Sequence, residues 1–213
     1  MNTTQDAVSM SENLQGKELK KGRRTMWALL LVTGLPFLAA LYLFYNPQVL
    51  DGFGTKNRGQ LVQPTVVLPS VKMQTLDGGT YDSASMQGNW SLLLLAGSSC
   101  NDNCMQNLFH LRQTRLAMGE NRYRVQRLML LTDEGNTSGL AKKLESFQGT
   151  HVLVGPAEAR DSLIRSLAVN GEAAEGRIYT IDPQGRLILS YDSNPPWEDV
   201  LKDLKYLIRV VQL

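Results

Sequence analysis

Residues 26–45 form an apolar stretch, MWALLLVTGLPFLAALYLFY, with no charged side chain in 20 residues. A helix rises about 1.5 Å per residue, so the stretch covers the roughly 30 Å of hydrocarbon in a bilayer. A cleaved signal peptide would carry an apolar region of about 7–15 residues followed by a small-residue cleavage site. This run is longer and ends in Tyr-Leu-Phe-Tyr-Asn-Pro. The stretch therefore predicts an uncleaved transmembrane helix.

The charges that flank this stretch predict its orientation. Five lysine and arginine side chains lie within residues 1–25, whereas Asp51, Lys56 and Arg58 follow the stretch with little net charge. Because basic flanks stay in the cytoplasm, we expect a cytoplasmic N-terminus and a single pass through the membrane. The C-terminal domain would then lie in the bacterial periplasm, or in the intermembrane space of a mitochondrion, where disulfides are permitted.

Composition divides the chain into four segments. Residues 1–25 are polar and aperiodic, which predicts a disordered cytoplasmic tail before the transmembrane helix at residues 26–45. Residues 46–64 are rich in Gly, Asn, Pro and Gln and predict a tether. Residues 65–213 are long enough for one domain, and they carry 15 basic and 16 acidic side chains. This near-neutral balance does not favour a nucleic-acid partner.

Strands and helices alternate after residue 64. We expect hairpins at residues 65–83 and 178–191, buried strands at 90–97 and 125–133, a short strand at 150–155, and helices at 104–118, 138–147, 157–169 and 197–211. This order predicts an α/β domain with a central mixed sheet flanked by helices. A cysteine pair where the first long strand meets a helix is typical of a thioredoxin-like fold.

The two cysteines, Cys100 and Cys104, lie four residues apart behind a run of leucines. A helix N-terminus favours thiolates, and thiolates are soft ligands that suit Cu(I). Asp102, between them, opposes thiolate formation, although its side chain is of the type that caps helices. The pair is a redox dithiol, two metal ligands or a structural disulfide. A loop this short gains little from cross-linking, which favours redox or metal chemistry.

The segment GNWSLLLLAGSSCNDNC, residues 88–104, resembles the signature of the SCO/SenC family of membrane-anchored, thioredoxin-like proteins. The matching positions of the tryptophan-containing strand and the C-x-x-x-C motif are Gly88, Trp90, Cys100, Asp102 and Cys104. Residues 130–133 and 178–191 are similar to the family's second strand and late hairpin. That family delivers copper to, or reduces, the copper site of cytochrome c oxidase.

The resemblance implies a thioredoxin-like domain behind one membrane anchor, acting in cytochrome c oxidase assembly. It implies that Cys100 and Cys104 exchange disulfides or bind Cu(I), and that the partner is the copper-site subunit of the oxidase or another assembly factor. We expect thiol–disulfide exchange with Cys100, in the loop, as the more exposed nucleophile. A copper chaperone with an incomplete site and a non-catalytic assembly protein with a structural disulfide remain alternatives.

The copper site of the SCO family includes a histidine shortly before the late hairpin, and this chain has Ala173 and Ala174 at that place. Arg177 occupies the cis-proline position of ordinary thioredoxins, and Asn101 replaces the proline that usually follows the first cysteine. These departures predict that the family's copper site is incomplete here.

No other residue in the sequence clearly replaces that histidine. His110 lies six residues after Cys104, which places it on a different face of the helix. We expect His110 and His151 to be structural or solvated. Met105 is not part of a repeated M-x-x-M cluster. The sequence therefore predicts that copper, if bound, lacks a third ligand.

Overall fold

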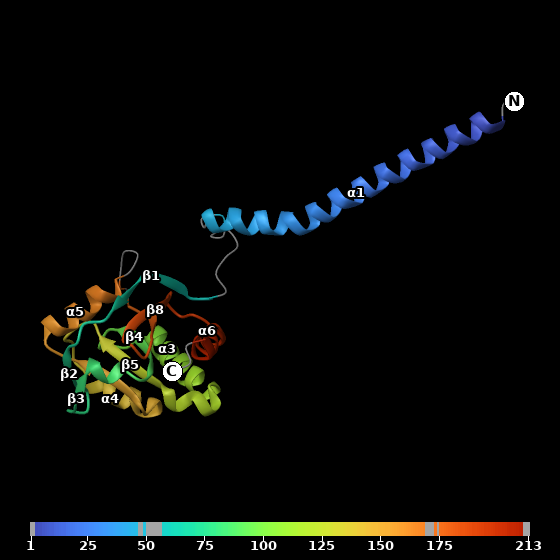
Figure 1. Cartoon of the computed structure of the whole chain (residues 1–213). Coiled ribbons are helices and arrows are strands. Elements are labelled where there is room, and N and C mark those ends of the chain that lie inside the picture. The colour runs from blue at the N-terminus through green and yellow to red at the C-terminus, as the bar shows by residue number, and fades with distance from the viewer. Residues whose placement is uncertain (1–2, 47–48, 50–56, 169–172, 174, 211–213) are drawn as a thin grey trace. The chain divides into compact units, whose positions relative to one another are not determined.

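The computed structural model describes residues 3–46, 49, 57–168, 173 and 175–210, and it divides into two compact units, residues 1–56 and 57–213 (Figure 1). The first unit contains one long helix, α1 (Thr3–Tyr45), with Pro36 inside it. Residues 3–25, expected to be disordered, are therefore helical. Within α1, residues Met26–Tyr45 have a mean hydropathy of 2.0 and are long enough to cross a membrane, which supports a single-pass anchor.

The second unit is built from strands and helices in the predicted alternation. Its elements are β1 (Gln60–Val67), β2 (Lys72–Thr75), β3 (Thr80–Asp82), β4 (Trp90–Ala96), α3 (Asp102–Ala117), β5 (Val125–Leu131), α4 (Ser138–Leu144), β6 (Thr150–Val154), α5 (Ala157–Leu167), β7 (Ile178–Ile181), β8 (Arg186–Tyr191) and α6 (Trp197–Val210). Short 3-10 helices at Ser83–Met86, Gly119–Arg124 and Glu145–Phe147 connect some of them.

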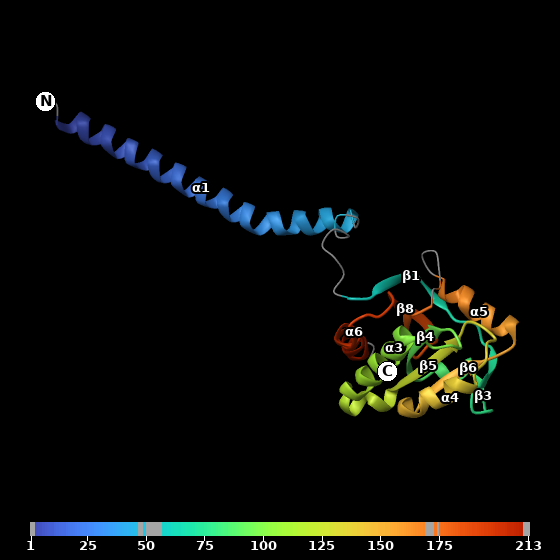
Figure 2. The ribbon, with the colours of Figure 1, turned by 180° about the vertical axis from the view of Figure 1, so that it is seen from behind.

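The strands form one mixed sheet in the order β1-β8-β7-β4-β5-β6-β2-β3. Figure 2 shows this unit from behind, with β1, β8, β4, β5, β6 and β3 labelled. The strands β4, β5 and β6 are parallel, and the other neighbours are antiparallel. The predicted fold class, a mixed α/β sheet with helices, is confirmed. β1 begins at Gln60, inside the predicted tether, and its last residues, expected in the first hairpin, pair with β8 instead. Its place at the edge of the sheet tolerates Pro64, which has no N–H to donate.

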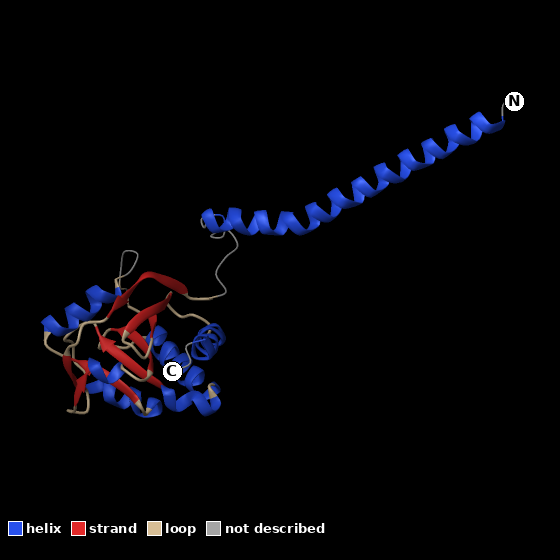
Figure 3. Ribbon diagram, in the orientation of Figure 1, coloured by secondary structure: helices blue, strands red, loops and turns tan. Residues whose placement is uncertain are grey.

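The strand β4 lies at the centre of this sheet and is buried along its whole length. Its leucines alternate between two apolar layers: Leu92 and Leu94 pack with residues of α3, α4 and α6, whereas Leu93 and Leu95 pack with residues of α5. Figure 3 shows the strands of the sheet in red with helices in blue around them. A strand covered on both faces needs a continuous apolar run, which is the pattern the sequence shows. The chain direction of β4 then carries Cys100 to the carboxyl edge of the sheet.

A buried carboxylate holds the start of the folded unit against its last helix. Asp203 of α6 is only 3% exposed. It accepts hydrogen bonds from the backbone N–H groups of Arg58 (2.8 Å) and Gly59 (2.8 Å) and from the Tyr191 hydroxyl (3.1 Å). Burial and the charge of Asp203 together raise the pKa of Tyr191 above its ordinary value. Asp203 therefore satisfies three donors from two segments, residues 58–59 and the end of β8, and connects both to α6.

Replacing Asp203 by Ala should lower the free energy of unfolding by about 2–4 kcal/mol, because three buried or partly buried donors lose this acceptor. Urea unfolding of the full chain in detergent micelles, followed by tryptophan fluorescence, measures this change. The control is D199A on the same helix, whose carboxylate pairs with Arg58 at 3.8 Å and Lys202 at 3.9 Å, both exposed. That control should change stability by no more than about 1 kcal/mol; equal losses in the two variants would contradict the assignment.

Candidate functional site

The cysteine pair lies where β4 passes into α3, and Cys100 and Cys104 form a disulfide with Cα atoms 5.1 Å apart. Cys100 lies in the loop and Cys104 in the first turn of α3, as the sequence predicts. The cap of α3 is Asn101, whose Oδ1 accepts from the Cys104 N–H at 3.0 Å. Asp102, the residue of capping type in the motif, is instead the first residue of the helix.

The disulfide is covered, contrary to expectation. Cys100 is 1% exposed and Cys104 is 4% exposed, and both belong to the apolar layer beneath α3. The expectation that Cys100 is the more exposed cysteine is therefore wrong, because the loop folds back onto the core. The disulfide is reached through a small hollow of about 50 Å³, lined by Ala96, Gly97, Ser99, Cys100, Asn101, Asn103, Cys104, Glu175 and Gly176.

The loop that carries Cys100 has an unusual backbone conformation. Cys100 has a φ of 37°, in the left-handed region that non-glycine residues rarely adopt. Such residues cost about 1–3 kcal/mol and occur at functional sites. The ammonium of Lys143 on α4 donates to the carbonyls of Ser99 (2.7 Å) and Cys100 (3.0 Å). Lys143 thus holds this loop and places a positive charge beside the Cys100 backbone.

The facing wall of the hollow is the turn before β7. The Gly176 N–H donates to the Leu95 carbonyl at 2.8 Å, and buried Asn107 donates to the Gly176 carbonyl at 3.0 Å. Gly176 has a φ of 86°, and a Cβ there would lie 2.6 Å from Ser193 Oγ and 2.7 Å from Asn103 Nδ2. Only glycine therefore lets this turn approach the cysteine loop so closely.

A second carboxylate, Asp133, organises the start of the same loop. It accepts from the Ser98 N–H at 2.9 Å and from the Ser98 hydroxyl at 3.2 Å. Partial burial raises the pKa of Asp133, but the hydrogen bonds from Ser98 and Gly135 outweigh burial and leave the pKa below its ordinary value. On the facing wall, the Thr132 hydroxyl donates to Glu175. These contacts connect the ends of β4, β5 and the turn before β7.

The structure also places the two histidines and Arg177 that stand out in the sequence. Neither His110 nor His151 lines the hollow, and the ring of His151 contacts that of Tyr81. Arg177 immediately precedes β7 and forms an ion pair with Asp192 at 2.8 Å. Within the described ranges, no three His, Cys, Asp and Glu side chains converge on a common metal position. Ala174, at the expected histidine position, lies outside the described residues.

The structure reveals four neighbours of the pair that the sequence did not predict, and Met105 is the nearest in sequence. The sulfur of Met105, one residue after Cys104, lies 3.8 Å from the Cys100 sulfur. The signal was present in the sequence as a methionine adjoining the C-x-x-x-C motif. Lys143, Glu175 and Gly176 were also missed, because they reach the site from segments distant in sequence.

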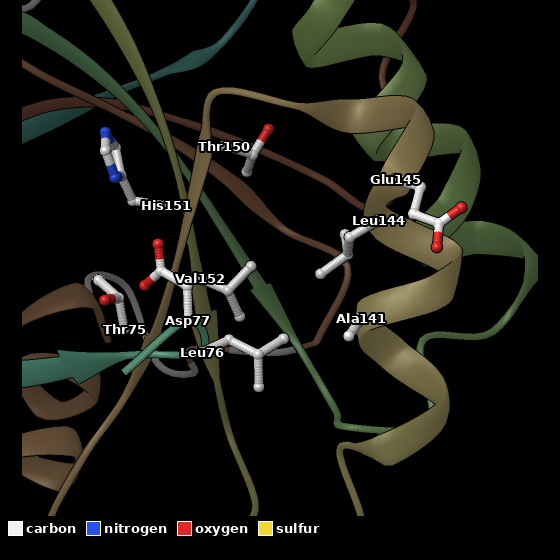
Figure 4. A pocket seen from close by; sticks show the side chains of 9 residues that line it. All are labelled: Thr75, Leu76, Asp77, Ala141, Leu144, Glu145, Thr150, His151 and Val152. Carbon is white, nitrogen blue, oxygen red and sulfur yellow. The ribbon is translucent and has the colours of Figure 1, made fainter. Parts of the chain in front are cut away.

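A larger pocket, of about 240 Å³, lies elsewhere, between α4 and the edge formed by β6 and the turn after β2 (Figure 4). Its lining combines apolar side chains with Asp77, Glu145 and His151. Neither cysteine lines it. The larger pocket is therefore separate from the disulfide, whose two cysteines line the smaller hollow.

Residues 90–211 match the family described as the transmembrane-like, thioredoxin-like, C-terminal domain. The chain belongs to this thioredoxin-like family. The match begins at β4 and includes the cysteine motif, the facing turn and α6. No curated protein sequence matches the chain.

Solved structures of the predicted SCO/SenC type share the fold of this thioredoxin-like chain. Copper-bound ScoI of Bradyrhizobium japonicum is 20% identical with a TM-score of 0.54, over 66% of this chain and 98% of that one. Yeast Sco1 is 15% identical with a TM-score of 0.60, over 71% and 99%. The thioredoxin domain of a thiol-disulfide oxidoreductase from Bacteroides vulgatus is 15% identical with a TM-score of 0.54, over 67% and 95%. The predicted SCO-like resemblance is thus confirmed at the level of the fold.

The depressed pKa of Asp133 gives a pH prediction. A carboxyl group with a lower pKa in the folded chain stabilises the fold above its unfolded pKa, and this contribution is lost as the pH falls through the folded value. We expect Asp133→Asn to lower Tm at neutral pH and to flatten the fall of Tm on acidification. Thermal melts of the full chain between about pH 7 and pH 3 test this around the ordinary carboxyl pKa of about 3.9.

The matched control for this titration is E134Q at the next position. The Glu134 side chain is 70% exposed and pairs only with Arg160 among the contacts of the described residues. The fall of Tm on acidification should be the same in E134Q as in the unmodified chain. If Tm falls on acidification in D133N as it does in the unmodified chain, the Asp133–Ser98 contacts do not hold the loop.

Proposed function

We propose that this chain is a membrane-anchored thiol–disulfide exchange protein that reduces a disulfide in a partner. In this proposal residues 1–25 are cytoplasmic, residues 26–45 span the membrane, and the thioredoxin-like domain faces the periplasm, or the intermembrane space of a mitochondrion. The partner is the copper-site subunit of cytochrome c oxidase or another factor in its assembly. Cys100 and Cys104 are the exchanging residues.

One observation carries the proposal: the disulfide is at the carboxyl edge of the sheet and the N-terminus of α3, with Cys100 in a strained backbone conformation. Ligand sites of α/β sheets lie at this edge. A disulfide whose only role were stabilisation would need neither this position nor a left-handed cysteine. Gly176 also lines the small hollow beside the two cysteines.

The exchange balances in two steps. The thiolate of the reduced Cys100 attacks one sulfur of the partner disulfide, and the other partner sulfur leaves as a thiolate and takes a proton. The Cys104 thiolate then attacks the Cys100 sulfur and releases the second partner thiol. Two electrons pass from the pair to the partner, and the pair ends in the disulfide form described above. A dithiol reductant outside this chain restores it.

Cys100 remains the proposed nucleophile, but the reason changes. Exposure does not distinguish the two cysteines, since both are almost fully covered. Lys143 places its ammonium 3.0 Å from the Cys100 carbonyl, and a nearby positive charge stabilises a thiolate. The Cys104 N–H could otherwise donate a hydrogen bond to a thiolate, but it already donates to Asn101 Oδ1. Because the sulfurs are covered, attack requires the loop at residues 98–101 to move.

The alternative is a non-catalytic assembly protein with a permanent disulfide. The burial of both sulfurs favours it, because a partner cannot reach them without that loop movement. The two functions differ in one observable property: only the first forms a covalent intermediate with another disulfide.

The variant Cys104→Ser, reduced and mixed with a synthetic peptide that carries an internal disulfide, should form a mixed disulfide through Cys100. The adduct persists because the resolving thiol is absent, and it appears as a mass increase on intact-protein mass spectrometry. It disappears on addition of a reductant, as a mixed disulfide must. The unmodified reduced chain should release reduced peptide and accumulate no adduct.

The matched control is C100S, which retains only Cys104. A slow or absent adduct in C100S supports Cys100 as the nucleophile, and the reverse result would assign the attack to Cys104. If neither variant forms an adduct, thiol–disulfide exchange is contradicted and the structural disulfide is supported.

A further inference from the structure

We propose that Met105 supplies a third sulfur ligand, so that the reduced chain binds Cu(I) through Cys100, Cys104 and Met105. A complete soft-metal site would then exist in a single turn of the chain, without a histidine. The inference rests on the proposed function in one respect: the cysteine pair must reach its dithiol form.

Distance is the first argument. Met105 Sδ lies 3.8 Å from Cys100 Sγ. With metal–sulfur bonds of about 2.3 Å, as thiolates make to Zn²⁺, three sulfurs around one ion in a plane lie about 4.0 Å apart. The observed separation of these two sulfurs is therefore already that of two ligands of one ion.

The third sulfur is held nearby by the backbone. The Cα atoms of Cys100 and Cys104 are 5.1 Å apart, so reduction separates the sulfurs without removing Cys104 from the site. The first turn of α3 fixes both following positions, since the Cys104 N–H is bonded to Asn101 Oδ1 at 3.0 Å and the Met105 N–H to the Asn101 carbonyl at 3.0 Å. Met105 is half-buried and packs against the apolar layer that contains both cysteines. All three side chains thus leave one short segment, in which the first turn of α3 fixes Cys104 and Met105.

Ligand chemistry is the second argument. Thiolate and thioether sulfurs are soft donors and select Cu(I), whereas carboxylates prefer hard ions. Glu175 lines the same hollow, but its carboxylate is a hard donor and already accepts from Thr132. Two thiolates and one Cu(I) leave a net charge of −1, and Lys143 provides a compensating ammonium at the Cys100 backbone. The apolar layer around the sulfurs limits water access to the ion.

The test is a competition titration of the pre-reduced full chain in detergent micelles, without oxygen, against a chromophoric Cu(I) chelator. Because loss of even an outer partner of a metal site reduces affinity by about 10–100-fold, Met105→Leu should weaken Cu(I) binding by at least about tenfold. M118L, a change at the other end of α3, and E175Q, a change of the competing oxygen donor, should leave the affinity within about twofold of the unmodified chain.

A spectroscopic measurement distinguishes ligation from an indirect effect. In selenomethionine-labelled protein loaded with one Cu(I), absorption at the copper edge should show one selenium neighbour beside two sulfurs, and M105L should lose the selenium. Circular dichroism of each variant verifies its fold. Because the chain is reduced chemically before the titration, Cu(I) binding does not depend on thiol–disulfide exchange. A failure to trap the mixed disulfide with the peptide therefore leaves this test unaffected.

Unchanged affinity in M105L together with two sulfurs and no selenium at copper would overturn the inference and leave a two-cysteine site. Loss of affinity in E175Q would do the same, by assigning the third ligand to oxygen. No detectable Cu(I) binding by the reduced chain would remove the site altogether.

Discussion

The burial of β4 on both faces determines where the cysteine pair of this domain lies. The strand is the centre of the sheet, and its leucines belong to two apolar layers at once. Because β4 cannot shift without disrupting both layers, the loop that follows it has a fixed origin. The parallel neighbour β5 ends at this edge just before Asp133, and the antiparallel neighbour β7 begins there just after Glu175. The cysteine pair therefore has a fixed place in the fold, although its loop is strained.

The same packing explains why the pair is covered. The cysteine loop folds back onto the core, where Lys143 satisfies two of its carbonyls and Asn101 caps α3. Burial protects the two sulfurs from nonspecific thiol–disulfide exchange with other thiols. The hollow beside them has a volume of about 50 Å³, which admits only a small chemical group. A site of this kind suits chemistry that is slow, specific for a partner and coupled to loop movement. It equally suits an ion held away from water.

Much of the fold could be predicted because its signals are local. The apolar run of β4, the second buried strand and the amphipathic C-terminal helix each follow from residues near in sequence, and the junction of strand and helix located the cysteines. The first residues of the edge strand β1, 60–64, were assigned to the tether because Gln60, Gln63 and Pro64 resemble a loop, and only the pairing with β8 shows otherwise.

The site could be predicted only in part, because its other members come together through tertiary packing. Lys143 and Glu175 lie far from the cysteines in sequence, and no local pattern distinguishes them from surface charges. The covering of Cys100 also depends on how the loop folds back, which motif spacing does not specify. Met105 is a different case: it adjoins the motif, but a methionine becomes a candidate ligand only once its sulfur is seen beside another.

The central claim is that Cys100 and Cys104 form a disulfide that is reduced and reformed in function. Equilibration of the full chain with thiol–disulfide buffers of known potential measures this directly, with the fraction of disulfide determined by mass spectrometry after alkylation. We predict a reduction potential above about −300 mV for the Cys100–Cys104 disulfide, which cellular dithiols can reduce. A potential well below about −300 mV would contradict the account and identify a permanent structural disulfide.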